Sequence, residues 1–178
     1  MRKVEVASYT EEWAGIFASE AEKLRSTFGE ELVEVHHIGS TSVHGLKAKP
    51  IIDIMIIVKE ISRVDYYNKD LQFLGYEPMG ENGITGRRFF QKGGNNRSHH
   101  IHIFQIGSPE ITRHLAFRDY LRAHPKVRNK YGALKEQLAN RFPWDIEAYI
   151  NGKNELVREI EQKAVKWYRL NCGEITQS

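Results

Sequence analysis

The sequence has a single cysteine and no long apolar run. Cys172 is the one cysteine among 178 residues, so no disulfide can form within the chain, and a reducing compartment such as the cytoplasm is expected. No run of 18 apolar residues is present, and the opening residues, MRKVEVASYTEEW, lack the apolar core of a signal peptide. We therefore expect a cytoplasmic protein without a membrane partner.

The chain also has little net charge. Its 26 Lys and Arg residues nearly balance 23 Asp and Glu residues, which leaves a net charge of +3 at pH 7. This mild basicity permits an anionic ligand but gives no strong signal for nucleic acid. The length and the 40% hydrophobic content suit one domain, and neither a repeat nor a linker interrupts it. We expect a single domain over residues 1–178.

Hydrophobic periodicity and turn residues predict both helices and strands. Gly93-Gly94-Asn95-Asn96 is a strong signal for a hairpin between the third and fourth strands. The expected strands are residues 32–38, 51–58, 86–92 and 99–106, and the expected helices are residues 10–28, 64–74, 108–124, 127–143 and 146–167. The pattern indicates an α+β domain whose C-terminal part is helical.

The second expected strand carries one acid in an apolar run. Alternation places Asp53, Met55 and Ile57 on one face, and both faces are apolar enough to be covered. A carboxylate there requires a metal ion, a cation or backbone donors, because its desolvation is costly. The alternative is an Asp at the end of the strand that is solvated or paired with Lys49 or an Arg.

A polar loop precedes this strand. Gly39, Ser40, Thr41 and Ser42 leave the first strand, so their amides and hydroxyls could converge on a phosphate, with Gly39 allowing close approach. A simple capped turn is the alternative, and for the loop taken alone it is the better interpretation. The spacing of a Walker loop is absent.

Two histidines share one face of the last strand. His100 and His102 lie two residues apart, so both imidazoles could ligate one metal ion or grip one phosphate. With Asp53 they would form a site of two nitrogens and one oxygen, which favours Zn²⁺, Mn²⁺, Fe²⁺ or Ni²⁺ over Mg²⁺. Sequence spacing does not fix whether the three converge.

Several cations fall on faces expected to point inward. Arg118, Lys135 and Lys153 lie on the inner stripes of their helices, and Lys49 precedes the Asp53 strand. A charge on an inner face is costly unless an anion meets it, so these residues predict an anion pocket. The alternative for each is a solvated side chain at the rim, since long side chains can extend to water.

These motifs, in this order, resemble the GrpB-like family, whose fold belongs to the nucleotidyltransferase superfamily. The resemblance rests on HIGSTSVHGL, KPIIDIMI, HHIHIF and HLAFRDYLRAHP, and it extends from Tyr9 to Tyr168. It implies a mixed sheet of about four or five strands, flanked by helices, with a C-terminal helical bundle. Related domains fused to dephospho-CoA kinases imply a nucleotide or coenzyme-A context.

The superfamily pattern also implies a function, and the sequence departs from that pattern. Gly39, Ser40 and Asp53 match it, whereas Met55 stands where the superfamily has a second acid, and His100 and His102 stand where it has a third. We expect Asp53, His100 and His102 to be the catalytic and metal-binding residues. The expected phosphate-binding residues are Gly39 to Ser42, Lys49, Arg118, Lys135 and Lys153. We expect a protein that binds a nucleotide or phosphorylated small molecule with Mg²⁺, Mn²⁺ or Zn²⁺. It either transfers a nucleotidyl group to an unknown acceptor or is a non-catalytic binding or accessory domain.

Overall fold

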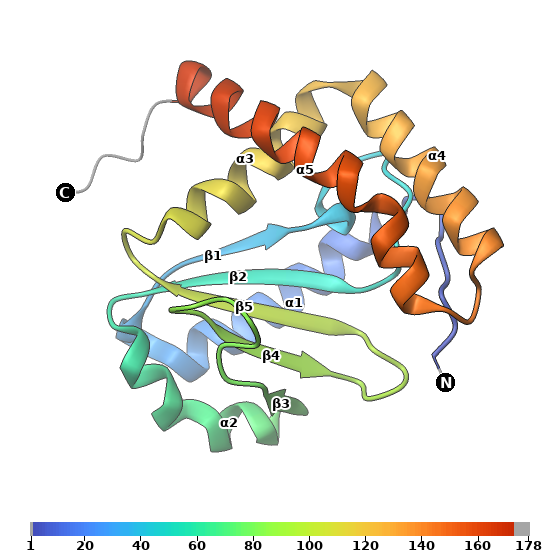
Figure 1. The fold of residues 1–178 in the computed structure, drawn as a ribbon. Coiled ribbons are helices and arrows are strands. Elements are labelled where there is room, and N and C mark those ends of the chain that lie inside the picture. The colour runs from blue at the N-terminus through green and yellow to red at the C-terminus, as the bar shows by residue number, and fades with distance from the viewer. Residues whose placement is uncertain (1, 173–178) are drawn as a thin grey trace.

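The computed structural model describes residues 2–172 as a five-stranded sheet with helices on both faces (Figure 1). Residue 1 and residues 173–178, the two ends of the expected 1–178 domain, lie outside the described residues. The strands are β1 (Leu32–Ile38), β2 (Ile52–Val58), β3 (Tyr76–Pro78), β4 (Arg88–Lys92) and β5 (His99–Gln105). The helices are α1 (Glu12–Phe28), α2 (Asn68–Phe73), α3 (Pro109–Ala123), α4 (Pro125–Arg141) and α5 (Ile146–Asn171). Short 3₁₀ segments are η1 (Gly29–Glu31), η2 (Ser40–Ser42) and η3 (Ile61–Tyr67).

The strand order is β1-β2-β5-β4-β3, and β2 and β5 form the parallel pair of this mixed sheet. The other neighbours are antiparallel, including the β4–β5 hairpin that the Gly-Gly-Asn-Asn turn predicts. In the parallel register Asp53 lies beside His100 and Met55 lies beside His102. The sheet therefore brings two motifs that are far apart in the sequence onto neighbouring strands.

The two faces of β2 belong to two separate cores, as the alternation predicts. Ile52, Ile54 and Ile56 pack with residues of α1 and α2. Met55 and Ile57 pack on the opposite face, beneath α3, α4 and α5. Both faces of the central strand are thus covered by helices, which confirms the expected mixed sheet with a C-terminal helical layer.

The structure departs from the local predictions in several places. The expected helix over residues 64–74 begins with the 3₁₀ segment η3, which is tied to the sheet by an Asp65–Arg88 ion pair of 2.8 Å. The strand expected from Gly86 begins at Arg88, because Gly86 has a positive φ of 81°. Strand β3 has three residues and ends in Pro78, so its sequence lacks a strand signal.

The N-terminal residues lie along α4 and α5 (Figure 1). Val4 is buried with Leu138 and Tyr149, and Ala7 forms a β-bridge with Ala48. Across residues 2–172, we find no helix whose length and apolarity would let it cross a membrane.

The burial of Met55 gives a stability prediction. Met55 is fully buried, so Met55→Asp should lower the free energy of unfolding by about 3–5 kcal/mol, because the new carboxylate would be charged and unpaired. Met55→Leu keeps the volume and should cost less than about 1.5 kcal/mol. Chemical denaturation of both variants checks this. A Met55→Asp variant as stable as the wild type would show that position 55 reaches water or a cation.

Candidate functional site

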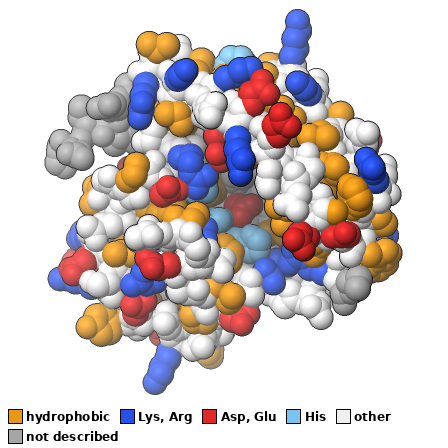
Figure 2. Space-filling model, in the orientation of Figure 1, with side chains coloured by type: hydrophobic (Ala, Val, Ile, Leu, Met, Phe, Trp, Pro, Cys, Tyr) orange, Lys and Arg blue, Asp and Glu red, His pale blue; other side chains and the backbone are white. Residues whose placement is uncertain are grey.

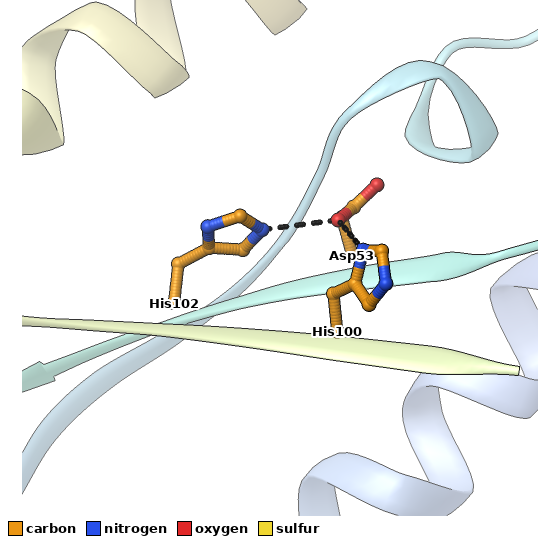
Figure 3. A group of neighbouring side chains, drawn as sticks. All are labelled: Asp53, His100 and His102. Atoms are coloured by element: carbon orange, nitrogen blue, oxygen red, sulfur yellow. Dashed lines mark hydrogen bonds and ion pairs between the residues drawn. The ribbon is translucent and has the colours of Figure 1, made fainter. Parts of the chain in front are cut away.

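Asp53, His100 and His102 converge at one end of the parallel strand pair (Figure 3). The Oδ1 atom of Asp53 lies 3.0 Å from Nε2 of His102 and 3.4 Å from Nδ1 of His100. One ligand atom from each of the three residues lies within 4.8 Å of the others, which is close enough to hold one metal ion. The structure therefore brings together three candidate residues whose convergence the sequence spacing could not predict.

The Asp53 carboxylate is held in its charged form. Burial would raise the pKa of Asp53, but hydrogen bonds from His100 and His102 outweigh burial and hold that pKa well below its ordinary range. The side chain is still 26% exposed, at the floor of a cavity. It is therefore a charged carboxylate that a ligand can reach.

Position 39 must be a glycine because the backbone there lies against the Asp53 carboxylate. Its φ is +71°, and a Cβ atom at this position would lie 2.6 Å from Oδ2 of Asp53. A side chain at position 39 would strain the backbone and collide with the carboxylate. The glycine predicted for a phosphate loop thus lets the loop lie directly against the acid.

The hydroxyls of the loop have different partners. Ser42 donates to the carbonyl of Gly39 at 2.5 Å. Thr41 accepts from His37 at 2.9 Å and donates to the carbonyl of Ile51 at 3.3 Å. Thr41 and Ser42 therefore shape the loop, while Ser40 and Thr41 line the cavity beside Asp53. Within residues 2–172 the hydroxyl of Ser40 has no hydrogen-bond partner, which leaves it free for a ligand.

Arg118 does not reach this cavity, contrary to the sequence prediction. Its guanidinium donates to the carbonyl of His37 at 3.2 Å and to Asp119 at 2.8 Å. Arg122 donates twice to the carbonyl of Ser42, at 2.9 and 2.7 Å, and Arg128 donates to the carbonyl of His44. Arg118 lies on the inner face of α3 as expected, but the group that meets it is the carbonyl of His37, near the end of β1. The three arginines thus bind backbone carbonyls before, within and after the loop.

The cavity in front of Asp53 has a volume of about 190 Å³. Figure 2 shows it as a hollow with histidine and acidic side chains inside it and Lys or Arg side chains beside it. Its walls are Ser40, Thr41, Lys49, Ile51, Asp53, His100, Lys135, Tyr149 and Lys153. Three of the four predicted basic residues thus face one space, together with Asp53 and His100.

Lys135 is the most unusual group of the cavity. It is 2% exposed, and its Nζ atom has no hydrogen-bond partner within residues 2–172. The ammonium lies 4.5 Å from the ring centre of Tyr131. Lys49 and Lys153 lie 5.1 and 5.6 Å from the ring centre of Tyr149. Aromatic faces therefore support three cations around the space, and within residues 2–172 none of the three forms an ion pair with a carboxylate.

These cations depress one another's proton affinity. Burial, followed by the charges of Lys153 and Lys49, lowers the pKa of Lys135 well below its ordinary value. Burial and the charge of Lys153 likewise lower the pKa of Lys49 to about 8. A bound anion would reverse both effects, because it would stabilise the charged amines.

Comparison with known proteins assigns the family. The sequence profile described as "GrpB protein" matches residues 3–163. The chain belongs to the GrpB family. The UPF0157 protein YqkA of Bacillus subtilis is 51% identical over 166 residues, which are 93% of this chain and 48% of YqkA. This GrpB chain therefore spans about half the length of that relative.

Two solved structures place the fold. The conserved protein GrpB from Enterococcus faecalis superposes with a TM-score of 0.89 at 45% identity, covering 92% of this chain and 99% of that one. Cid1, solved in complex with the UTP analogue UMPNPP, has a TM-score of 0.51 at 15% identity, over 75% of this chain and 43% of Cid1. The fold of this GrpB protein is nucleotidyltransferase-like.

The GrpB site also contains residues that the sequence reading passed over as site residues. Tyr149 lies in the expected helix over residues 146–167, where nothing in the sequence marks it as a site residue, yet its ring lies beneath two lysines of the cavity wall. Arg87 and Arg97 lie behind His102 and His100. Their contacts depend on the loops around them, and no sequence spacing indicates such contacts.

The buried amine of Lys135 gives a prediction with a definite pH dependence. Its folded-state pKa is lowered, so the unfolded chain binds a proton that the folded chain releases. That difference makes the free energy of unfolding rise with pH from the lowered pKa up to about 10.4, the ordinary lysine value. Lys135→Met should stabilise the fold by about 1–4 kcal/mol at pH 7 and remove this rise.

Denaturation at several pH values measures both effects. Lys130→Met is the matched control, because Lys130 lies on the same helix and is exposed. A Lys135→Met variant that is less stable than the wild type would mean that the amine has a stabilising partner.

Proposed function

We propose that this GrpB protein is a metal-dependent nucleotidyltransferase that acts on an unknown acceptor. The observation that carries the proposal is the buried, unpartnered amine of Lys135, which shares one small cavity with the charged carboxylate of Asp53. A site with three cations and a carboxylate suits an anion that arrives with a divalent ion. A nucleoside triphosphate bound with a metal ion is such a ligand.

The size of the cavity suits the phosphates of a nucleotide. Its volume of about 190 Å³ is below the roughly 300–1,000 Å³ of pockets that enclose whole small molecules. Both Lys49 and Lys153 approach the ring of Tyr149, so that ring is occupied by cations. The phosphates would enter the cavity, and the nucleoside would remain outside it.

The roles of the residues follow from their positions. Ser40 and the loop would hold a phosphate oxygen, while Lys49, Lys135 and Lys153 would neutralise the polyphosphate. Asp53 would hold the ion, and His100 and His102 face the Oδ1 atom of the same carboxylate. A divalent ion bound there would polarise phosphate oxygens. Catalysis would then consist of positioning and of electrostatic stabilisation as pyrophosphate leaves.

The proposal predicts pyrophosphate release that depends on Asp53. With the four nucleoside triphosphates and Mg²⁺ or Mn²⁺, the wild type should release pyrophosphate as water or a nucleotide hydroxyl takes the nucleotidyl group in place of the acceptor. Asp53→Asn should reduce kcat by about 10²–10³-fold. Asp70→Asn is the control, because Asp70 is exposed on α2. Turnover that is unchanged in Asp53→Asn would exclude Asp53 from the reaction.

A second candidate function is a non-catalytic domain that binds a nucleotide or a coenzyme-A-related molecule. It is favoured by Met55, which stands two residues after Asp53 and is fully buried in the core. The single carboxylate of β2 leaves out one acid that a two-metal reaction needs.

Thermal shift with nucleotides, coenzyme A and its precursors separates the two functions. A ligand at 100 times its Kd should stabilise the protein by about 2.7 kcal/mol. Lys135→Met should abolish that shift, whereas Lys130→Met should keep it. Tight binding without turnover in any divalent ion would favour the binding domain. An absence of any shift would contradict both functions.

A further inference from the structure

An arginine stands behind His102 and is fixed in place. Arg87 is 6% exposed, and its Nε and Nη2 atoms donate to the carbonyls of Glu81 and Asn82 at 3.1 and 2.7 Å. Its remaining Nη1 atom lies 3.3 Å from Nδ1 of His102. Two backbone carbonyls therefore aim this guanidinium at the side of the imidazole that faces away from Asp53.

A second arginine stands behind His100 in the same way. Arg97 donates from Nε to the carbonyl of Gly94 at 3.2 Å and from Nη1 to Oε1 of Gln91 at 2.6 Å. The same Nη1 atom lies 3.1 Å from Nε2 of His100. The β4–β5 hairpin thus places a guanidinium at the outer nitrogen of the second imidazole.

These contacts determine where the imidazole protons lie. A guanidinium can only donate, so the ring nitrogen that faces it must accept. Nδ1 of His102 and Nε2 of His100 are therefore unprotonated, and the one N–H of each neutral ring lies on the nitrogen that faces Asp53. The two histidines take opposite tautomers, Nε2–H in His102 and Nδ1–H in His100, and both donate toward Oδ1.

We propose that Arg87 and Arg97 are positioning residues that make His102 and His100 hydrogen-bond donors to Asp53 and exclude both imidazoles as metal ligands. A histidine that ligates a metal normally donates its other N–H to an acceptor. Here the outer partner is itself a donor. For either ring to ligate an ion, its proton would have to move to the outer nitrogen and meet the guanidinium N–H.

This arrangement selects the kind of ion. Without the two imidazoles, Asp53 offers one carboxylate, and the remaining ligands must come from water and from the phosphates of the substrate. Mg²⁺ and Mn²⁺ accept such oxygen ligands, whereas Zn²⁺ loses the nitrogens it favours. The choice of ion rests on the proposed function, but the tautomers do not.

Long-range ¹H–¹⁵N NMR spectra of the histidine rings test the tautomers directly. In neutral to mildly alkaline buffer, the wild type without nucleotide should show His100 as Nδ1–H and His102 as Nε2–H. His100→Gln and His102→Gln assign the signals. The opposite tautomer at either ring would overturn the proposal, whether or not the protein has any transferase activity.

Zn²⁺ titration of Arg97 variants tests the consequence. Arg97→Gln replaces a pure donor with a side chain that can also accept, so Zn²⁺ affinity should rise about 10-fold or more. Arg97→Lys keeps the charge and the donor, so its affinity should equal that of the wild type. Arg88→Gln removes the same charge from β4, where the side chain pairs with Asp65, and should change the affinity less than about 2-fold.

The outcomes are distinct. If Arg97→Gln binds Zn²⁺ no better than Arg97→Lys, the arginine does not control ligation and the proposal fails. If wild-type protein binds Zn²⁺ tightly and His100→Gln or His102→Gln abolishes this binding, the imidazoles are ligands and the proposal also fails.

Discussion

The charged carboxylate of Asp53 is the constraint on which the site depends. It stands at the start of a strand that is buried on both faces, where an unpaired charge would be costly. The parallel pairing of β2 with β5 supplies His100 and His102 as partners, and Gly39 lets the loop lie against the second oxygen. The pairing of β2 with β5, the glycine of the loop and the two histidines of β5 thus all serve to accommodate the Asp53 side chain.

The C-terminal helices both close the core and carry charge into the site. Residues of α3, α4 and α5 cover one face of the sheet. The same layer brings Lys135 and Lys153 to the cavity. It also brings three arginines of α3 and α4 to backbone carbonyls before, within and after the loop. A buried amine without a partner reduces stability. Because the amine of Lys135 adds nothing to the stability of the fold, its presence is consistent with selection for binding an anion.

The sequence predicted the parts of the site that depend on local periodicity. Alternation placed Asp53 opposite the isoleucines and put His100 and His102 on one face, and both assignments are confirmed. It could not predict that β2 and β5 are neighbours, because that pairing depends on the topology of the whole chain. Helix periodicity placed Arg118 on an inner face without showing that a backbone carbonyl would meet it. Arg87 and Arg97 were missed as site residues because carbonyls of irregular loops aim them.

A crystal structure with Mg²⁺ and a non-hydrolysable nucleoside triphosphate would test the central claim most directly. That claim is that the cavity between Asp53 and Lys135 receives the phosphates of a nucleotide. The account predicts phosphate oxygens beside Ser40, Lys135 and Lys153, and an ion in contact with Asp53 but with neither imidazole. A nucleotide bound elsewhere while this cavity stays empty at saturating concentration would contradict it.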